Sequence, residues 1–136
     1  MKTYATLFFA ILFFLACAPD RSALNKLVEE TMQVHDEAMA KMGDMNRLAR
    51  TLRDELNLAD SLALSQGRRD SLAAVLTGIT KAEEDMMNWM TNYKEPTVDT
   101  KLEEAMQYMT KSKADIDKNY ADMVKAIEAA QAAAKQ

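Results

Sequence analysis

Apolar and small residues recur at alternating intervals of four and three from residue 24 to residue 56. Side chains with this spacing lie along one face of an α-helix. Further apolar residues flank the seam on both sides, so the face is wide enough to contact two neighbouring helices. The pattern predicts a helix over about 22–57 whose seam consists of Leu24, Val28, Thr31, His35, Ala38, Met42, Met45, Ala49, Leu52 and Leu56.

A second helical pattern is clearest between Leu72 and Tyr93, and its first turns are interrupted by the polar run Gln66-Gly67-Arg68-Arg69. Two interpretations are open, because Gly67 is a potential helix breaker. One helix spans about 60–93, or a short helical loop precedes a helix that begins near Asp70. The first interpretation is favoured, since it gives a length that matches the helices on either side.

Pro96 marks a loop, because proline cannot occupy a helix interior and disfavours helical geometry at Glu95. Thr100 and Glu103 have the spacing of a capping box, which predicts the start of a third helix over about 100–135. The seam of this helix is expected to consist of Leu102, Met106, Met109, Lys113, Ile116, Tyr120, Met123, Ile127, Ala130 and Ala134.

Three helices of about 35 residues, each about 50 Å long, joined by short connections, must run up, down and up. No strand pattern competes with this interpretation. The predicted fold is therefore all-α, an elongated antiparallel three-helix bundle that forms one domain over residues 22–136. The start of the first helix, the end of the second and the start of the third should lie at one end of it.

Residues 1–16 have the layout of a secretory signal, with Lys2 near the start and an apolar run that ends in small residues. Phe14-Leu15-Ala16-Cys17 looks like the lipobox of bacterial lipoproteins, in which the cysteine becomes the first mature residue and carries diacylglycerol. Cys17 is the single cysteine of the chain. Residues 17–21 would then form a short tether. Cleavage after Ala18 to release a secreted protein, or retention of the apolar run as an anchor, are the alternatives.

Loss of residues 1–16 removes Lys2 from the 17 basic residues and none of the 21 acidic ones, which leaves a net charge of −5. This mildly acidic chain has no basic patch of the kind that nucleic acid requires. The expected partner is a membrane, bound through lipidated Cys17, with an unidentified protein as a second partner. The expected location is the bacterial cell envelope, with the outer membrane favoured and the bundle facing the periplasm or the exterior.

Three polar residues interrupt the apolar seams: His35, Glu83 and Lys113. If the turns are centred near residues 58–59 and 96–97, these residues fall in one layer of the bundle. Such a layer can fix helix register, with charged tips that reach water. The competing interpretation is a ligand or proton site in which Glu83 favours the charged form of His35.

Methionines cluster near the same layer, and thioethers together with one histidine can bind Cu(I) or haem iron. The candidate ligands are His35, Met32, Met86 and Met109. The competing interpretation, which helical spacing favours, is that methionine fills the core. No cofactor is expected. A single histidine, and serines without a histidine nearby, exclude the common nucleophilic triads, so no enzymatic activity is predicted.

The stretches 34–43 (VHDEAMAKMG) and 86–90 (MMNWM) resemble two signatures of a group of small Bacteroidota lipoproteins, some of which carry the label "viral A-type inclusion protein". The resemblance implies an envelope lipoprotein with a helical fold and no known activity. Together these features predict a membrane-anchored, non-enzymatic helical bundle that acts as a structural or protein-interaction module. The alternative is a lipoprotein that binds a small ligand or a metal through His35 and the methionines.

Overall fold

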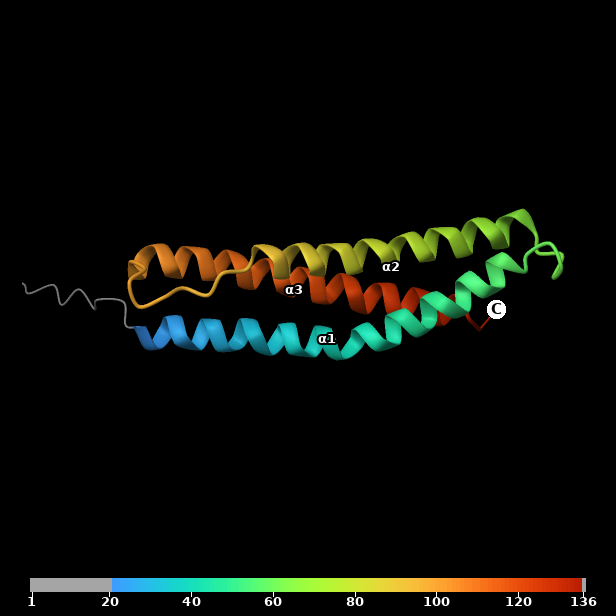
Figure 1. Cartoon of the computed structure of the whole chain (residues 1–136). Helices are drawn as coiled ribbons and strands as arrows, with labels where there is room; N and C mark the ends of the chain where they lie inside the picture. Colours follow the sequence, from blue (N-terminus) through green and yellow to red (C-terminus); the bar gives the residue numbers. More distant parts are fainter. Residues whose placement is uncertain (1–20, 136) are drawn as a thin grey trace, which may run out of the picture.

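The computed structural model describes residues 21–135, which form three α-helices and no strand (Figure 1). The helices are α1 (Arg21–Asn57), α2 (Gln66–Asn92) and α3 (Leu102–Ala133). They run antiparallel in chain order, and α3 packs extensively against both α1 and α2, which contact each other less. The predicted all-α, up-down-up three-helix bundle is therefore confirmed.

The buried residues of α1 all belong to its predicted seam. They repeat mainly at intervals of seven, which keeps them on the side of the helix that faces both partners. Because residues flanking the seam are also partly buried, α1 presents the wide apolar face that contact with two helices requires. The fully or nearly fully buried side chains are Leu24, Thr31, Ala38, Met45, Ala49 and Leu52.

The second helix begins at Gln66, six residues later than the favoured prediction of a helix over 60–93. Ser65 caps it, since its hydroxyl accepts a hydrogen bond from the Arg68 backbone N–H at 3.2 Å. Ala63 has a left-handed backbone with φ 51°, which a continuous helix cannot contain. Residues 58–65 therefore form a turn, and neither sequence interpretation placed the helix start correctly.

The start of α3 also differs from its prediction. Lys101 is the N-cap residue and makes no side-chain capping bond. The Thr100 hydroxyl instead accepts a hydrogen bond from the Thr97 backbone N–H at 3.2 Å, within a turn in which Thr100 N–H bonds to the Thr97 carbonyl. The capping box is absent because the preceding turn already uses the Thr100 side chain.

The buried face of α3 is wider than its predicted seam. Four predicted positions are fully buried: Met109, Ile116, Met123 and Ala130. Ala134 is exposed and the other five are only partly buried. Five further residues, each directly before a predicted seam position, are buried instead. Small or uncharged side chains at these places allow close approach between helices, and they are Ala105, Ser112, Asn119, Ala126 and Ala133.

The two ends of the bundle are closed in different ways. At one end lie the start of α1, the start of α3 and the loop at residues 93–101, whereas α2 stops at Asn92 and does not reach this end as predicted (Figure 1). At the other end, which we call the distal end, the Arg68 guanidinium makes two hydrogen bonds to the Glu55 carboxylate, at 2.8 and 2.9 Å, and one to the Ala133 carbonyl at 2.8 Å. One side chain of α2 therefore joins α1 and α3 at the distal end.

Gly78 lies in the interior of α2, where a Cβ atom would meet nothing within 4 Å. We predict that Gly78→Ala raises the free energy of unfolding by about 1 kcal/mol, because alanine loses less backbone entropy in a helix than glycine does. Urea unfolding measures this change. The control is Gly67→Ala, which also has open space but lies in the first turn of α2, and should gain less. A less stable Gly78→Ala variant would contradict the open space around Gly78.

Candidate functional site

The Trp89 side chain contacts all three helices. Its ring stacks on His35 of α1, with centroids 5.8 Å apart, and on Tyr93, which directly follows α2, with centroids 4.7 Å apart. Its indole N–H donates a hydrogen bond to the Ser112 carbonyl oxygen of α3 at 3.0 Å. We call these four residues the Trp89 cluster. Helical spacing puts Trp89 on the inner face of α2, and the indole N–H finds the acceptor that a buried tryptophan requires.

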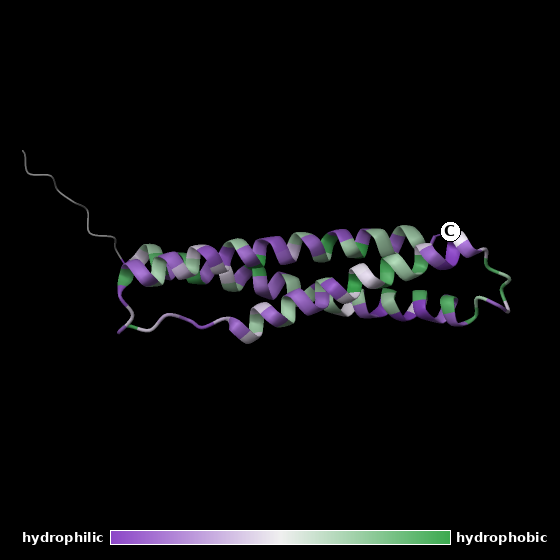
Figure 2. Ribbon diagram, turned by 90° about the horizontal axis from the view of Figure 1, so that it is seen from above, coloured by the Kyte–Doolittle hydropathy of each residue, from purple (hydrophilic) through white to green (hydrophobic). Residues whose placement is uncertain are grey.

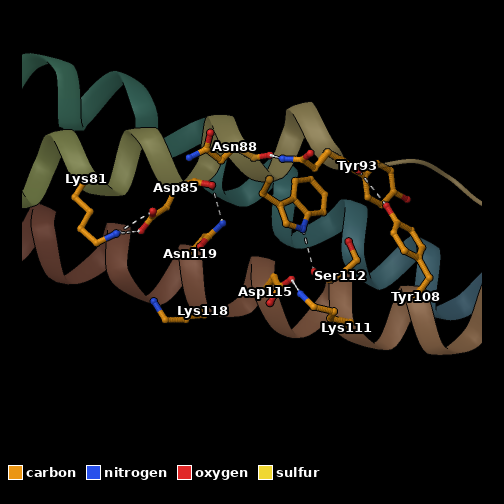
Figure 3. A pocket seen from close by; sticks show the side chains of 12 residues that line it. Lys81, Asp85, Asn88, Tyr93, Tyr108, Lys111, Ser112, Asp115, Lys118 and Asn119 are labelled. Carbon is orange, nitrogen blue, oxygen red and sulfur yellow. Dashed lines mark hydrogen bonds and ion pairs between the residues drawn. The ribbon is translucent and has the colours of Figure 1, made fainter.

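A second hydrogen bond runs in the opposite direction between the same two helices. The Asn119 side-chain amide of α3 donates to the Asp85 backbone carbonyl of α2 at 3.1 Å (Figure 3). Asn119 and Ser112 are only 9% and 7% exposed, so competition with bulk water is limited at both bonds. The two bonds fix the position of α3 along α2.

A groove with a volume of about 590 Å³ lies between α2 and α3, and its floor is formed by Trp89, Ser112 and Asn119. Its rim carries three lysines, each paired with the aspartate four residues later. The nitrogen to oxygen distances are 2.8 Å for Lys81 with Asp85 and 2.5 Å for both Lys111 with Asp115 and Lys118 with Asp122.

The paired lysine side chains are largely exposed, so each pair adds little stability. Hydrogen bonding from Lys118 keeps the pKa of the Asp122 carboxyl below its ordinary value. The rim lysines and the Asn119 amide are thus already engaged within the protein. The groove is built as a seam between helices, and it holds no paired nucleophile and base.

Two tyrosines at the end of this groove differ in how their hydroxyl groups are placed (Figure 3). The Tyr108 hydroxyl accepts a hydrogen bond from the Lys94 backbone N–H at 2.6 Å. The Tyr93 hydroxyl is buried and has no hydrogen-bond partner. Burial, followed by the negative charge of Glu95 and the neighbouring Tyr108, raises the pKa of Tyr93 above its ordinary value.

The structure places Trp89, rather than Glu83, level with His35. Glu83 lies six residues earlier on α2, about 9 Å away along the helix axis. The cause is the turn between α1 and α2, which spans 58–65 and is therefore centred about three residues later than predicted. The prediction for α3 was closer, because Trp89 bonds to Ser112, the residue before Lys113.

Each predicted polar residue has a different environment. The His35 side chain is 19% exposed, and its Nδ1 lies 3.0 Å from Asp36 Oδ1. One carboxylate oxygen of Glu83 is buried without a hydrogen-bond partner. Lys113 pairs with Asp117 at 2.7 Å, within its own helix. No hydrogen bond or ion pair joins the three among the interactions described, so a shared polar site stays a prediction.

The candidate metal ligands lie in separate surroundings. Met86 and Met109 are fully buried and belong to two different hydrophobic clusters. Met32 lines a shallow surface depression with Asp36 and other outer residues of α1. Over residues 21–135, no group of three or more histidine, cysteine, aspartate or glutamate side chains is placed to hold a metal ion. Cys17, the predicted lipidation site, lies outside the described residues.

Sequence reasoning missed Ser112, Asn119 and Tyr108. It followed the larger apolar residues of α3, whereas Ser112 and Asn119 make the hydrogen-bonded contacts with α2. One signal was available: Ser112 and Asn119 are seven residues apart, in register with Ala105 and Ala126. Such a seven-residue repeat of uncharged residues beside an apolar seam indicates a second contact face.

Comparison of the chain with protein-family models, curated proteins and solved structures gave no match. Within residues 21–135, none of the helices combines the length and the apolar character needed to cross a membrane.

The two tyrosines provide a matched test of the groove. We predict that Tyr93→Phe leaves the free energy of unfolding unchanged or raises it by up to about 1 kcal/mol, because it removes a buried hydroxyl without a partner. Tyr108→Phe should lower it by about 1 kcal/mol, since the Lys94 N–H loses its acceptor. Urea unfolding near neutral pH measures both. The reverse order of stabilities would contradict the hydrogen bonding described here.

The raised pKa of Tyr93 also predicts a pH dependence. A phenol whose pKa is higher in the folded state than its ordinary value of 10.0 ionises less readily in the folded chain than in the unfolded chain, so its ionisation lowers the stability of the fold. The phenol is neutral in both states at lower pH, and the loss develops as the pH rises through the folded-state pKa. The wild-type protein should therefore lose more stability than Tyr93→Phe between about pH 9 and pH 11. Equal losses in the two proteins would show that Tyr93 does not titrate differently on folding.

Proposed function

We propose that this protein is a membrane-tethered, non-enzymatic lipoprotein of the bacterial envelope whose helical bundle is a spacer that presents an interaction surface. The observation that carries the proposal is the placement of the ends. Helix α1 begins four residues after Cys17, and the turn at residues 58–65 lies at the other end of the 37-residue helix. At 1.5 Å per residue, the two ends are about 55 Å apart.

The distal turn has features of a docking surface. Leu58 and Leu62 are each 53% exposed, and Figure 2 shows apolar residues in the turn at this end. The turn is held by Arg69, which pairs with Asp60 at 2.8 Å and donates to the Leu64 carbonyl at 3.2 Å. Because the backbone of the turn is ordered before binding, less conformational entropy is lost when a partner protein binds to it.

The Trp89 cluster and the hydrogen bonds from Arg68 to Glu55 and Ala133 support the spacer role. They fix the helices relative to one another near the middle and at the distal end of the bundle. A lipid anchor at Cys17 would keep the chain on the membrane, since acyl chains contribute about 0.8 kcal/mol per buried CH2. Leu58 and Leu62, which we call the distal leucines, form the proposed binding surface. We propose no catalytic role for the groove between α2 and α3.

Membrane attachment is tested by Cys17→Ser. Removal of the only thiol prevents lipidation, and we predict that the variant moves from the membrane fraction to the soluble fraction after cell lysis. Cell fractionation with immunodetection measures the distribution. Wild-type protein washed in high salt is the control, because a lipid anchor resists salt and an electrostatic contact does not. An unchanged membrane fraction for Cys17→Ser would refute anchorage through this residue.

The interaction surface is tested with a photo-crosslinking amino acid at Leu62 in living cells. We predict a discrete crosslinked product from Leu62 and none from Met87, which is 52% exposed but lies on the side of α2. The matched exposure separates a specific surface from general collision. Leu58→Ser should weaken the Leu62 product. Equal crosslinking from the two positions, or none from Leu62, would contradict a distal docking surface.

A further inference from the structure

The turn at residues 97–100 is attached to the first residue of α1. The Arg21 guanidinium donates hydrogen bonds to the Val98 carbonyl oxygen at 2.7 Å and to the Thr100 carbonyl oxygen at 2.9 Å. The turn is also closed by the Thr100 N–H, which donates to the Thr97 carbonyl at 3.1 Å. Residues 97–100 therefore keep a fixed position beside the start of α1.

Val98 is the most exposed of the large hydrophobic side chains in the described part of the chain, at 83%. It belongs to neither hydrophobic cluster. Together with Pro96 and Thr97, it lines one side of a shallow groove whose other side includes Leu24 and Val28 of α1. An apolar side chain so fully exposed on a hydrogen-bonded turn contributes nothing to the core, and its position suggests contact with something outside the bundle.

The length of chain before α1 limits what that contact can be. Only three residues lie between Cys17 and Arg21, and the four residue steps from Cys17 to Arg21 span about 14 Å at most. Arg21 in turn touches Val98. A lipidated Cys17 therefore keeps the turn within a short distance of the bilayer surface, at a high effective concentration.

We infer that residues 97–100, with Val98 at the tip, rest in the polar interface of the membrane that holds Cys17. The inference rests on the proposed lipid anchor and adds an orientation to it. The charges around the turn are mixed, with Lys94 and Lys101 beside Glu95 and Asp99. Docking should therefore need the tether and should not depend on anionic lipid.

If the membrane contacts the end of the bundle and not its side, the long axis of the bundle points away from the bilayer. The distal leucines then point away from the membrane and are open to a partner. The turn at residues 97–100 would thus set the direction in which the spacer presents its surface.

The test uses an environment-sensitive fluorophore attached to a cysteine. Because lipidation consumes the Cys17 thiol, Val98→Cys and the control Leu62→Cys each carry one free thiol in the lipidated protein. Both proteins are purified from membranes and reconstituted into vesicles of phosphatidylcholine, and into vesicles of phosphatidylcholine with phosphatidylglycerol. The measurements are vesicle flotation, the emission wavelength and quenching by iodide.

We expect a blue-shifted emission and about threefold weaker quenching at residue 98 than at residue 62 in both lipid mixtures. Equal quenching at the two positions in protein that floats with the vesicles would overturn the docking while the lipid anchor stands. Protein that does not float would overturn the anchor and the docking together. Labelled Val98→Cys in the Cys17→Ser background should show no shift with vesicles, and a shift there would overturn the dependence on the tether.

Discussion

The contact on which the bundle most depends is made by the Trp89 indole. Apolar seams hold helices together, but contacts between alternating apolar side chains change little when one helix slides by a heptad. Directional bonds remove this freedom. Trp89 donates to the Ser112 carbonyl and stacks on His35, while Asn119 donates back to the Asp85 carbonyl. The three helices are therefore held in one register.

Register at the middle of the bundle determines what happens at its ends. Once α2 and α3 are aligned, Arg68 reaches both Glu55 and the Ala133 carbonyl, and this contact closes the distal end. At the opposite end the bundle is thinner, because α2 stops at Asn92 and residues 93–101 continue as a loop beside α1 and α3. A rod with two different ends suits the proposed role, in which one end meets a membrane and the other a protein.

Much of this fold follows from the spacing of apolar residues. The seam of α1 was predicted correctly, because each of its buried residues is apolar or small and recurs at helical intervals. The start of α2 was not, since it depends on the Ser65 cap and on the left-handed backbone at Ala63. Periodicity describes the faces of a helix and carries less information about where a polar turn ends and a helix begins.

The candidate site was predicted in part. His35 does lie at an inner position, but its neighbour is the Trp89 ring and not Glu83. A turn centred a few residues later changes which residue of α2 lies opposite each residue of α1. The hydropathy of Ser112 and Asn119 does not predict their burial, which depends on their contacts with α2; only their seven-residue spacing indicates an inner position. The anchor and the partner depend on molecules outside the chain, so sequence alone yields hypotheses for them.

The central claim is that Trp89 joins α2 to α3 through a directional hydrogen bond and contacts α1 by stacking on His35. It is tested most directly by urea unfolding of Trp89→Phe. Phenylalanine keeps an aromatic ring at the position and lacks the indole N–H. We predict a loss of about 2 kcal/mol in the free energy of unfolding, from the lost hydrogen bond and the smaller buried area. A loss below about 0.5 kcal/mol, within the range of an ordinary surface substitution, would contradict the claim.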